Sequence, residues 1–96
     1  YLPINKKLRS KKIKTIERDS KEKKITQIFI ETPYRNVQLL NTILAVCNKT
    51  TRLCIASNIS TKKEFISTKT IAEWKEEKIN LHKHPTIFLI ESNYTK

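Results

Sequence analysis

Five consecutive residues carry the strongest chemical signal in the sequence. Glu31, Thr32, Pro33, Tyr34 and Arg35 bring together a carboxylate, a turn proline, an aromatic ring and a guanidinium. They stand where an apolar, β-rich segment gives way to a helical pattern, and in open α/β sheets ligands collect at the carboxyl ends of strands. Two interpretations are open. Either these residues belong to a binding site, or Glu31 and Arg35 pair to stabilise the loop and the helix start.

The other reactive side chains form no catalytic or metal-binding pattern. Cys47 and Cys54 fall at a helix end and in an apolar strand, where free cysteines behave as small hydrophobic residues in a reducing compartment. His82 and His84 flank a lysine in a polar loop, without a further ligand nearby. No Ser-His-Asp or Cys-His unit presents itself. We therefore predict no metal site and assign no catalytic residue.

Composition excludes several classes of protein. The chain has 96 residues and no glycine, whereas a P-loop and a Rossmann turn both need glycine for close backbone approach to phosphate. No apolar run approaches the roughly 18 residues of a membrane span, so we expect a cytoplasmic protein without a membrane partner. The length suits one modest domain. Because the chain starts at Tyr1 rather than Met, we expect a piece of a longer protein.

Positive charge is concentrated at the N-terminal end. The chain holds 20 Lys or Arg against 9 Asp or Glu, a formal net charge of +11. Residues 1–24 hold ten of these cations against three acids, a net charge of +7. RNA or DNA phosphates would attract such a segment. The alternative is compositional drift, because Lys outnumbers Arg sixteen to four and Lys, Ile and Asn have AT-rich codons.

Hydrophobic periodicity and turn residues predict the secondary structure. In chain order we expect a helix at about 6–21 capped by Asn5, a buried strand at 25–31, a helix from 35 to about 47, a strand at 52–56, a weaker strand at 64–70, a short helix at 71–77 and a strand at 86–91. This order predicts the α/β class, with a small mixed sheet of about four to five strands covered by helices. Trp74 is expected to anchor the short helix on the sheet, and residues 92–96 to fray.

Several of these segments resemble one family. Residues 27–35 resemble the E-x-P-[HY]-R signature of the ribosomal RNA small-subunit methyltransferase I family, the (cytidine-2'-O) branch of the tetrapyrrole methylase superfamily. Residues 1–3 and the basic helix are similar to its F-x-P segment and K-x-x-R helix. Residues 52–74 resemble its A-R-E-L-T … E … G-T-L-x-E-L segment, and residues 85–90 its closing strand. The residues of these segments are most similar to those of Bacteroidetes-type S-adenosylmethionine-dependent methyltransferases.

The resemblance covers nearly the whole chain but only the C-terminal half of such an enzyme. It implies that residues 1–96 form a single C-terminal domain, without the N-terminal domain and its glycine-rich loops. S-adenosylmethionine would lie between the two domains, against a wall formed by Ile30, Glu31, Ala56, Ser57, Pro85 and Thr86. The residues implied to face substrate RNA or the partner domain are Tyr34, Arg35, Lys11, Lys12 and Lys14.

Two functions are consistent with these observations. The first is the C-terminal part of a methyltransferase acting on ribose 2'-oxygen in small-subunit rRNA, inactive alone. Its partners would be rRNA or the small ribosomal subunit and the missing N-terminal domain, with a homodimer implied by the superfamily. The alternative is a stand-alone basic module that binds RNA without catalysis.

Overall fold

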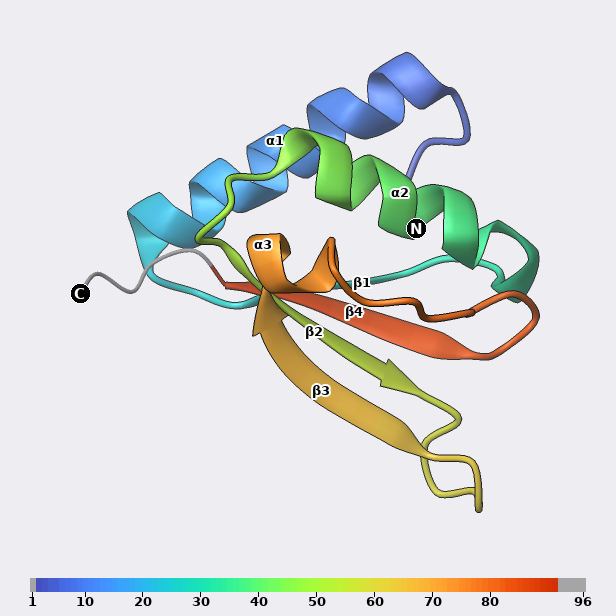
Figure 1. Ribbon diagram of the computed structural model, residues 1–96. Coiled ribbons are helices and arrows are strands. Elements are labelled where there is room, and N and C mark those ends of the chain that lie inside the picture. Colours follow the sequence, from blue (N-terminus) through green and yellow to red (C-terminus); the bar gives the residue numbers. More distant parts are fainter. Residues whose placement is uncertain (1, 92–96) are drawn as a thin grey trace.

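The computed structural model describes residues 2–91 (Figure 1). The elements in chain order are α1 (Lys6–Lys23), β1 (Gln27–Ile30), the 3₁₀ turn η1 (Pro33–Arg35), α2 (Asn36–Val46), β2 (Arg52–Ser57), β3 (Phe65–Thr70), α3 (Ile71–Trp74) and β4 (Thr86–Glu91). The predicted α/β class and the predicted order of helices and strands are confirmed. The fraying expected for residues 92–96 lies outside the described residues.

The strands form one sheet in the order β1-β4-β2-β3, and each pairing is antiparallel. β1 and β2 run in the same direction and are joined through α2, but β4 is inserted between them. In this split β-α-β arrangement the two parallel strands never pair with each other. The expected mixed sheet is therefore corrected to an antiparallel sheet within residues 2–91.

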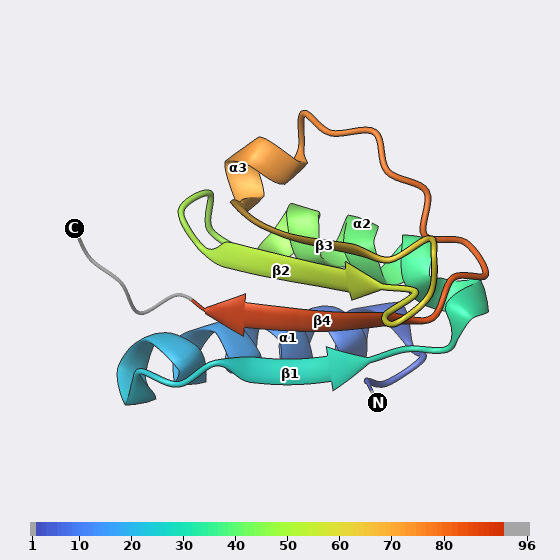
Figure 2. The same ribbon diagram turned by 90° about the horizontal axis from the view of Figure 1, so that it is seen from below.

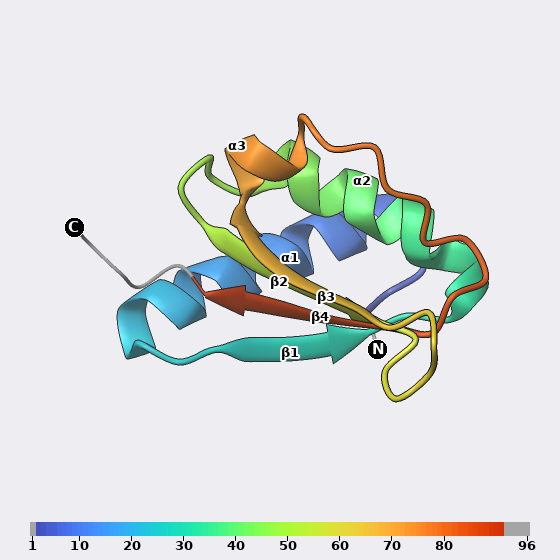
Figure 3. The ribbon, with the colours of Figure 1, turned by 60° about the horizontal axis from the view of Figure 1, so that its bottom comes forward.

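Helices α1, α2 and α3 cover one face of the sheet (Figures 1 and 2). Within residues 2–91 no element lies on the opposite face, and the view in Figure 3 shows α1 and α2 together on the covered side. The core lies between these two layers. Its largest buried members are Ile13, Leu39, Ile43, Leu53, Ile55, Ile71, Trp74, Leu81, Phe88 and Ile90.

The first strand is less buried than its composition predicts. Phe29 points into the core and stacks on Phe88 at a ring separation of 5.8 Å, but Ile28 is 66% exposed. β1 lies at the edge of the sheet, and its alternate side chains fall on the uncovered face. The prediction of a buried strand at 25–31 is corrected to a half-buried edge strand, because no layer covers its outer face.

Helix α1 begins as predicted, with the Asn5 side chain accepting a hydrogen bond from the Leu8 amide at 3.1 Å. Its buried face is unusually polar, because Arg9, Glu17 and Ser20 share it with two isoleucines. Glu17 accepts hydrogen bonds from the Asn48 amide and the Thr51 hydroxyl. This buried carboxylate therefore connects α1 to the loop between α2 and β2.

Trp74 anchors α3 on the sheet, as predicted. Its indole N–H donates to the Leu53 carbonyl at 2.7 Å, and the residue is 2% exposed. The helix is shorter than the expected 71–77. The amides of Glu76 and Glu77 bond to carbonyls three residues back, at 3.1 and 3.0 Å, so the chain continues in tighter turns.

Candidate functional site

A hollow of about 420 Å³ opens at the edge of the sheet where β1 and β2 end and β4 begins. The strand register explains why these ends meet, since Ile87 pairs with Ile30 on one side and with Ala56 on the other. The residues that line this sheet-edge hollow are Ile30, Glu31, Pro33, Ala56, Ile59, Pro85, Thr86 and Ile87. Most of these side chains are apolar, so the hollow suits a ligand with an apolar body and few polar groups.

The structure brings together five of the six residues that the resemblance assigned to the cofactor wall. These are Ile30, Glu31, Ala56, Pro85 and Thr86. Ser57 pairs with Thr86 in the sheet but lines a neighbouring hollow of about 240 Å³ on the side of His84. The geometry thus places the predicted residues in one region, and their role in binding a cofactor stays a prediction.

Glu31 is the charged group of this hollow, and it is buried. Its Oε1 lies 3.2 Å from the guanidinium of Arg35 and accepts a hydrogen bond from the Thr32 amide at 2.7 Å. Its Oε2 is buried without a hydrogen-bond partner among residues 2–91. Buried polar atoms normally have a partner. The orphaned oxygen is therefore an acceptor still available to a donor group.

The turn after β1 is fixed by its own sequence. Pro33 occupies the start of η1, where its ring presets the backbone for a tight turn. Its carbonyl accepts a hydrogen bond from the Lys83 amide at 3.0 Å. The loop before β4 is thereby held against the end of β1, on the two sides of the sheet-edge hollow.

Asn36 is a positioning residue that the sequence did not reveal. It is fully buried at the start of α2, and its Nδ2 lies 2.6 Å from the His84 carbonyl and 3.2 Å from both the Leu81 carbonyl and Thr86 Oγ1. These contacts span 45 to 50 residues of sequence. An asparagine at a helix start is an ordinary sequence signal, so no local pattern could separate this role from a cap.

The predicted RNA or interdomain residues lie at the surface, outside the sheet-edge hollow. Tyr34 is 68% exposed, with His82 edge-on to its ring at 6.2 Å and the Lys83 ammonium 5.9 Å from the ring centroid. Arg35 is one-third exposed beside Glu31. The lysines predicted on the first helix, which are Lys11, Lys12 and Lys14, are all exposed on α1. Their contact with RNA stays a prediction.

The cysteines and histidines form no reactive group among the described residues. Both cysteines are free, and burial followed by the Glu17 carboxylate raises the pKa of the Cys47 thiol to about 12. Such a thiol stays protonated at neutral pH. His84 Nδ1 lies 3.2 Å from the side-chain amide of Asn58. Within residues 2–91, no three His, Cys, Asp or Glu side chains are placed to hold a metal ion.

Comparison with known proteins identifies the fold. No protein-family model and no curated protein matches the chain. One similar solved structure is the "Crystal structure of the methyltransferase CobJ", with a TM-score of 0.53 and 14% identity over 94% of this chain. The chain has a methylase-like fold. It spans 38% of the CobJ chain.

The tetrapyrrole methylase-like fold implied by the resemblance is thereby confirmed at the level of architecture. The assignment to the ribosomal RNA branch, and the division into a C-terminal domain and a separate cofactor domain, stay predictions. No helix among residues 2–91 is long and apolar enough to cross a membrane.

Proposed function

We propose that this chain is the C-terminal part of an S-adenosylmethionine-dependent methyltransferase that acts on a ribose 2'-oxygen of small-subunit rRNA. The observation that carries the proposal is the sheet-edge hollow. Residues distant in sequence, such as Glu31, Ala56 and Thr86, line it together, and they match the positions that the resemblance assigns to the cofactor wall. The methylase-like fold supports the same proposal.

The residues of the hollow fit one side of an adenosine-bearing cofactor. Ile30, Ala56 and Ile87 offer an apolar surface to a flat ring, and the buried Oε2 of Glu31 offers an acceptor to a hydroxyl or amino group. When bound, S-adenosylmethionine supplies the methyl group. The hollow is open on one side, and in this proposal a separate N-terminal domain closes it. This chain alone would hold half of the site and be inactive.

The role of the chain would be to position the cofactor and the substrate rather than to transfer a proton. Methyl transfer requires the accepting oxygen, the methyl group and the leaving sulfur to be held in line, so geometry dominates the rate. Pro33 and Asn36 provide that rigidity by fastening the loop before β4 to the end of β1 and the start of α2. In this proposal the protein is cytoplasmic, its substrate partner is rRNA or the small ribosomal subunit, and homodimer formation follows the superfamily.

A steric variant of the native-length protein tests the proposal. Ala56→Phe fills the sheet-edge hollow from its wall, and we expect loss of S-adenosylmethionine binding by calorimetry and loss of methyl transfer to small-subunit rRNA. Ala72→Phe is the matched control, because Ala72 is exposed on α3 and lies outside the hollow. Equal cofactor binding by both variants would contradict the assigned site. Turnover by residues 1–96 alone would contradict the claim that the chain is inactive.

The alternative function is an RNA-binding module without catalysis. The concentration of positive charge on α1 favours it, since the cations of that helix are mostly exposed. This function predicts RNA affinity that falls steeply with salt, with no cofactor binding even in the native-length protein. The calorimetric measurement above separates the two functions.

A further inference from the structure

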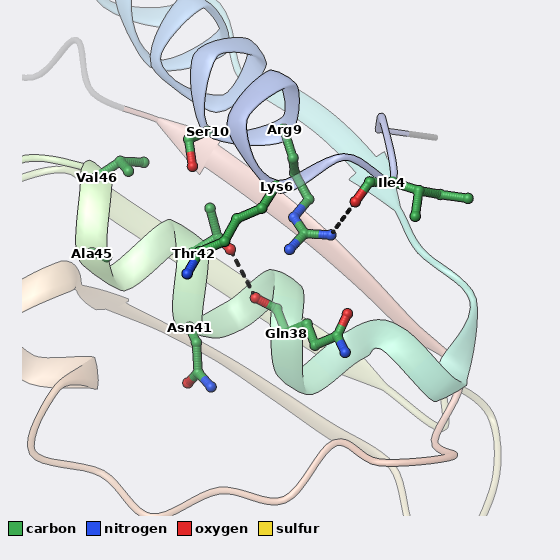
Figure 4. Close-up of a pocket in the computed structure, with 9 residues that line it drawn as sticks. All are labelled: Ile4, Lys6, Arg9, Ser10, Gln38, Asn41, Thr42, Ala45 and Val46. Carbon is green, nitrogen blue, oxygen red and sulfur yellow. Dashed lines mark hydrogen bonds between the residues drawn. The ribbon is translucent and has the colours of Figure 1, made fainter.

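A second hollow, of about 490 Å³, lies between α1 and α2 (Figure 4). It is on the covered side of the sheet and shares no residue with the sheet-edge hollow. Its lining combines apolar and polar side chains with two cations and contains no Asp or Glu. The lining residues are Ile4, Lys6, Arg9, Ser10, Gln38, Asn41, Thr42, Ala45 and Val46.

Arg9 is the unusual group in this interhelical hollow. It is 5% exposed, and Figure 4 shows its guanidinium reaching from α1 towards α2. One terminal nitrogen donates to the Ile4 carbonyl at 3.3 Å, whereas Nε is buried without a hydrogen-bond partner. Among residues 2–91, no carboxylate lies within ion-pair distance of Arg9. A buried cation is normally paired with an anion. Residues 2–91 provide no anion for this guanidinium, so we expect a bound anion to pair with it.

The start of α1 adds further positive charge to the same place. The first turn holds Lys6 and Lys7 and no acidic residue, although the positive end of the helix dipole disfavours cations there. Lys6 lines the hollow, and Figure 4 shows its side chain extending towards Thr42 on α2. The arrangement is unfavourable for the isolated helix but favourable towards a bound anion.

The positive charge continues along α1, beside the end of α2 and the loop that follows it. A neighbouring hollow of about 380 Å³ shares Val46 with the first and is lined by the cations Lys14, Arg18 and Lys21. The acid on this wall is Glu17, which is engaged with Asn48 and Thr51. From Lys6 to Lys21 the helix rises about 22 Å. Such a length suits a polymer with repeated negative charge better than a single small anion.

We propose that the groove between α1 and α2 binds the backbone of single-stranded RNA, with Arg9 and Lys6 holding one phosphate in the interhelical hollow. A planar guanidinium matches phosphate oxygens with two parallel hydrogen bonds. The amide side chains of Gln38 and Asn41 provide additional donors on the α2 side. The inference rests on the proposed function for the identity of the polymer as RNA.

The groove and the sheet-edge hollow lie at the same end of the sheet. In Figure 2 the starts of α1 and α2 lie at the end of the sheet where β1 and β2 terminate. The sheet-edge hollow opens at this same end. The sheet-edge hollow lies on the uncovered face, because Ile30 and Ile87 alternate with the core residues Phe29 and Phe88. An RNA strand held in the interhelical groove would therefore reach the proposed cofactor wall by passing around this end of the molecule.

The experiment compares two adjacent lysines that carry the same charge. Lys6 and Lys7 are both exposed, but only Lys6 lines the hollow. Binding of a fluorescein-labelled oligouridylate is measured by anisotropy over a series of salt concentrations. We expect Lys6→Ala to weaken binding about tenfold at low salt and Lys7→Ala less than about twofold, with the slope of log affinity against log salt reduced by about 0.7 for Lys6→Ala. Equal effects of both variants would mean diffuse attraction and overturn the proposal.

Arg9 is tested through a pair of variants because its burial affects folding. Arg9→Lys keeps the charge but loses the paired donors, and we expect RNA binding to fall at least about tenfold while circular dichroism remains unchanged. Arg9→Met removes the charge and should weaken binding further. Inorganic phosphate is the competing probe. If it displaces the RNA at equal phosphate concentration, the pocket recognises a free phosphate rather than a polymer, and the proposal is overturned.

The result of the RNA-binding experiments is independent of the methyltransferase test. Lys6→Ala should leave S-adenosylmethionine binding of the native-length protein unchanged, and Ala56→Phe should leave RNA affinity unchanged. If cofactor binding is absent while Lys6→Ala and Lys7→Ala differ in RNA affinity as expected, the proposed function is wrong but the proposed RNA groove is supported. If RNA binding is absent at low salt while methyl transfer occurs, the groove is wrong and the proposed function remains.

Discussion

The carboxylate of Glu31 and the guanidinium of Arg35 lie 3.2 Å apart, with the first side chain 1% exposed and the second 33% exposed. The pair thus joins the end of β1 to the 3₁₀ turn before α2. It satisfies both interpretations of the sequence, since it stabilises the turn and also holds a carboxylate in the wall of the sheet-edge hollow. The two contributions can be separated by measurement.

Removing the arginine should destabilise the fold. In Arg35→Ala the Glu31 carboxylate stays buried and keeps the Thr32 amide as its hydrogen-bond donor. We expect the free energy of unfolding, measured with urea, to fall by about 1–3 kcal/mol, because a buried charged group loses its partner.

A double variant provides the control. Arg35→Ala combined with Glu31→Gln leaves no buried charge, so part of the lost stability should return. If Arg35→Ala unfolds at the same urea concentration as the unmodified chain, the pair does not stabilise the turn, and its role would lie in binding alone.

Asn36 should matter more for stability than other polar residues of α2. Asn36→Ala leaves the buried Leu81 carbonyl and the partly buried His84 carbonyl without this donor, and we expect a loss of about 2 kcal/mol in the free energy of unfolding. Asn41→Ala is the matched control, since Asn41 is exposed on the same helix, and should change stability by less than about 0.5 kcal/mol. Equal stability of the two variants would contradict the positioning role.

Local patterns were enough to predict the elements, because each depends on residues close in sequence. The Asn5 cap, the apolar period of α2 and the alternation of β4 are signals of this kind. The burial of β1 could not be predicted in the same way. Whether Ile28 is covered depends on which strand lies at the sheet edge and which face receives the helices, and both are decided by contacts distant in sequence.

The residues of the two hollows differ in the same way, since some could be predicted from the sequence and others could not. The residues of the sheet-edge hollow were carried over from a family resemblance, and the strand register places Ile30, Ala56 and Thr86 together. Arg9 and Glu17 gave no such signal. Among the many charges of the first helix they look like solvated residues, and only the packing of α1 against α2 and the following loop reveals that they are buried.

The two cysteines should differ sharply in reactivity. The Cys47 thiol is buried and its pKa is raised to about 12, so about one molecule in ten thousand carries the reactive thiolate at pH 8. Cys54 is half-buried on β2, with its side chain on the uncovered face. We expect iodoacetamide at neutral to mildly alkaline pH to label Cys54 in the native chain and Cys47 only in denaturant, as followed by peptide mass spectrometry.

A variant makes that measurement decisive. Cys54→Ser should take up almost no label while folded and one label after unfolding. Labelling of native Cys47 at the rate of Cys54 would show that the end of α2 opens readily, contrary to its packing against α1.

The start of α3 should respond to acid through Glu73. Glu73 Oε1 accepts the Thr70 amide at 2.8 Å, and the Thr70 hydroxyl accepts the Glu73 amide at 3.2 Å, which forms a capping box. The hydrogen bond from the Thr70 backbone, followed by that from its side chain, lowers the pKa of Glu73 from 4.5. A folded-state pKa below the unfolded value means stability that is present above the unfolded pKa and lost as the pH falls through the folded one.

Glu73→Gln keeps the shape of the box without a titrating group. We expect the unmodified chain to be more stable than this variant at neutral pH, with the difference in unfolding free energy closing as the pH falls below about 4.5. Glu76→Gln removes an exposed carboxylate that takes no part in the box and controls for the change in net charge. A difference for Glu73→Gln that stayed constant down to about pH 3 would show that the ionised carboxylate does not stabilise the cap.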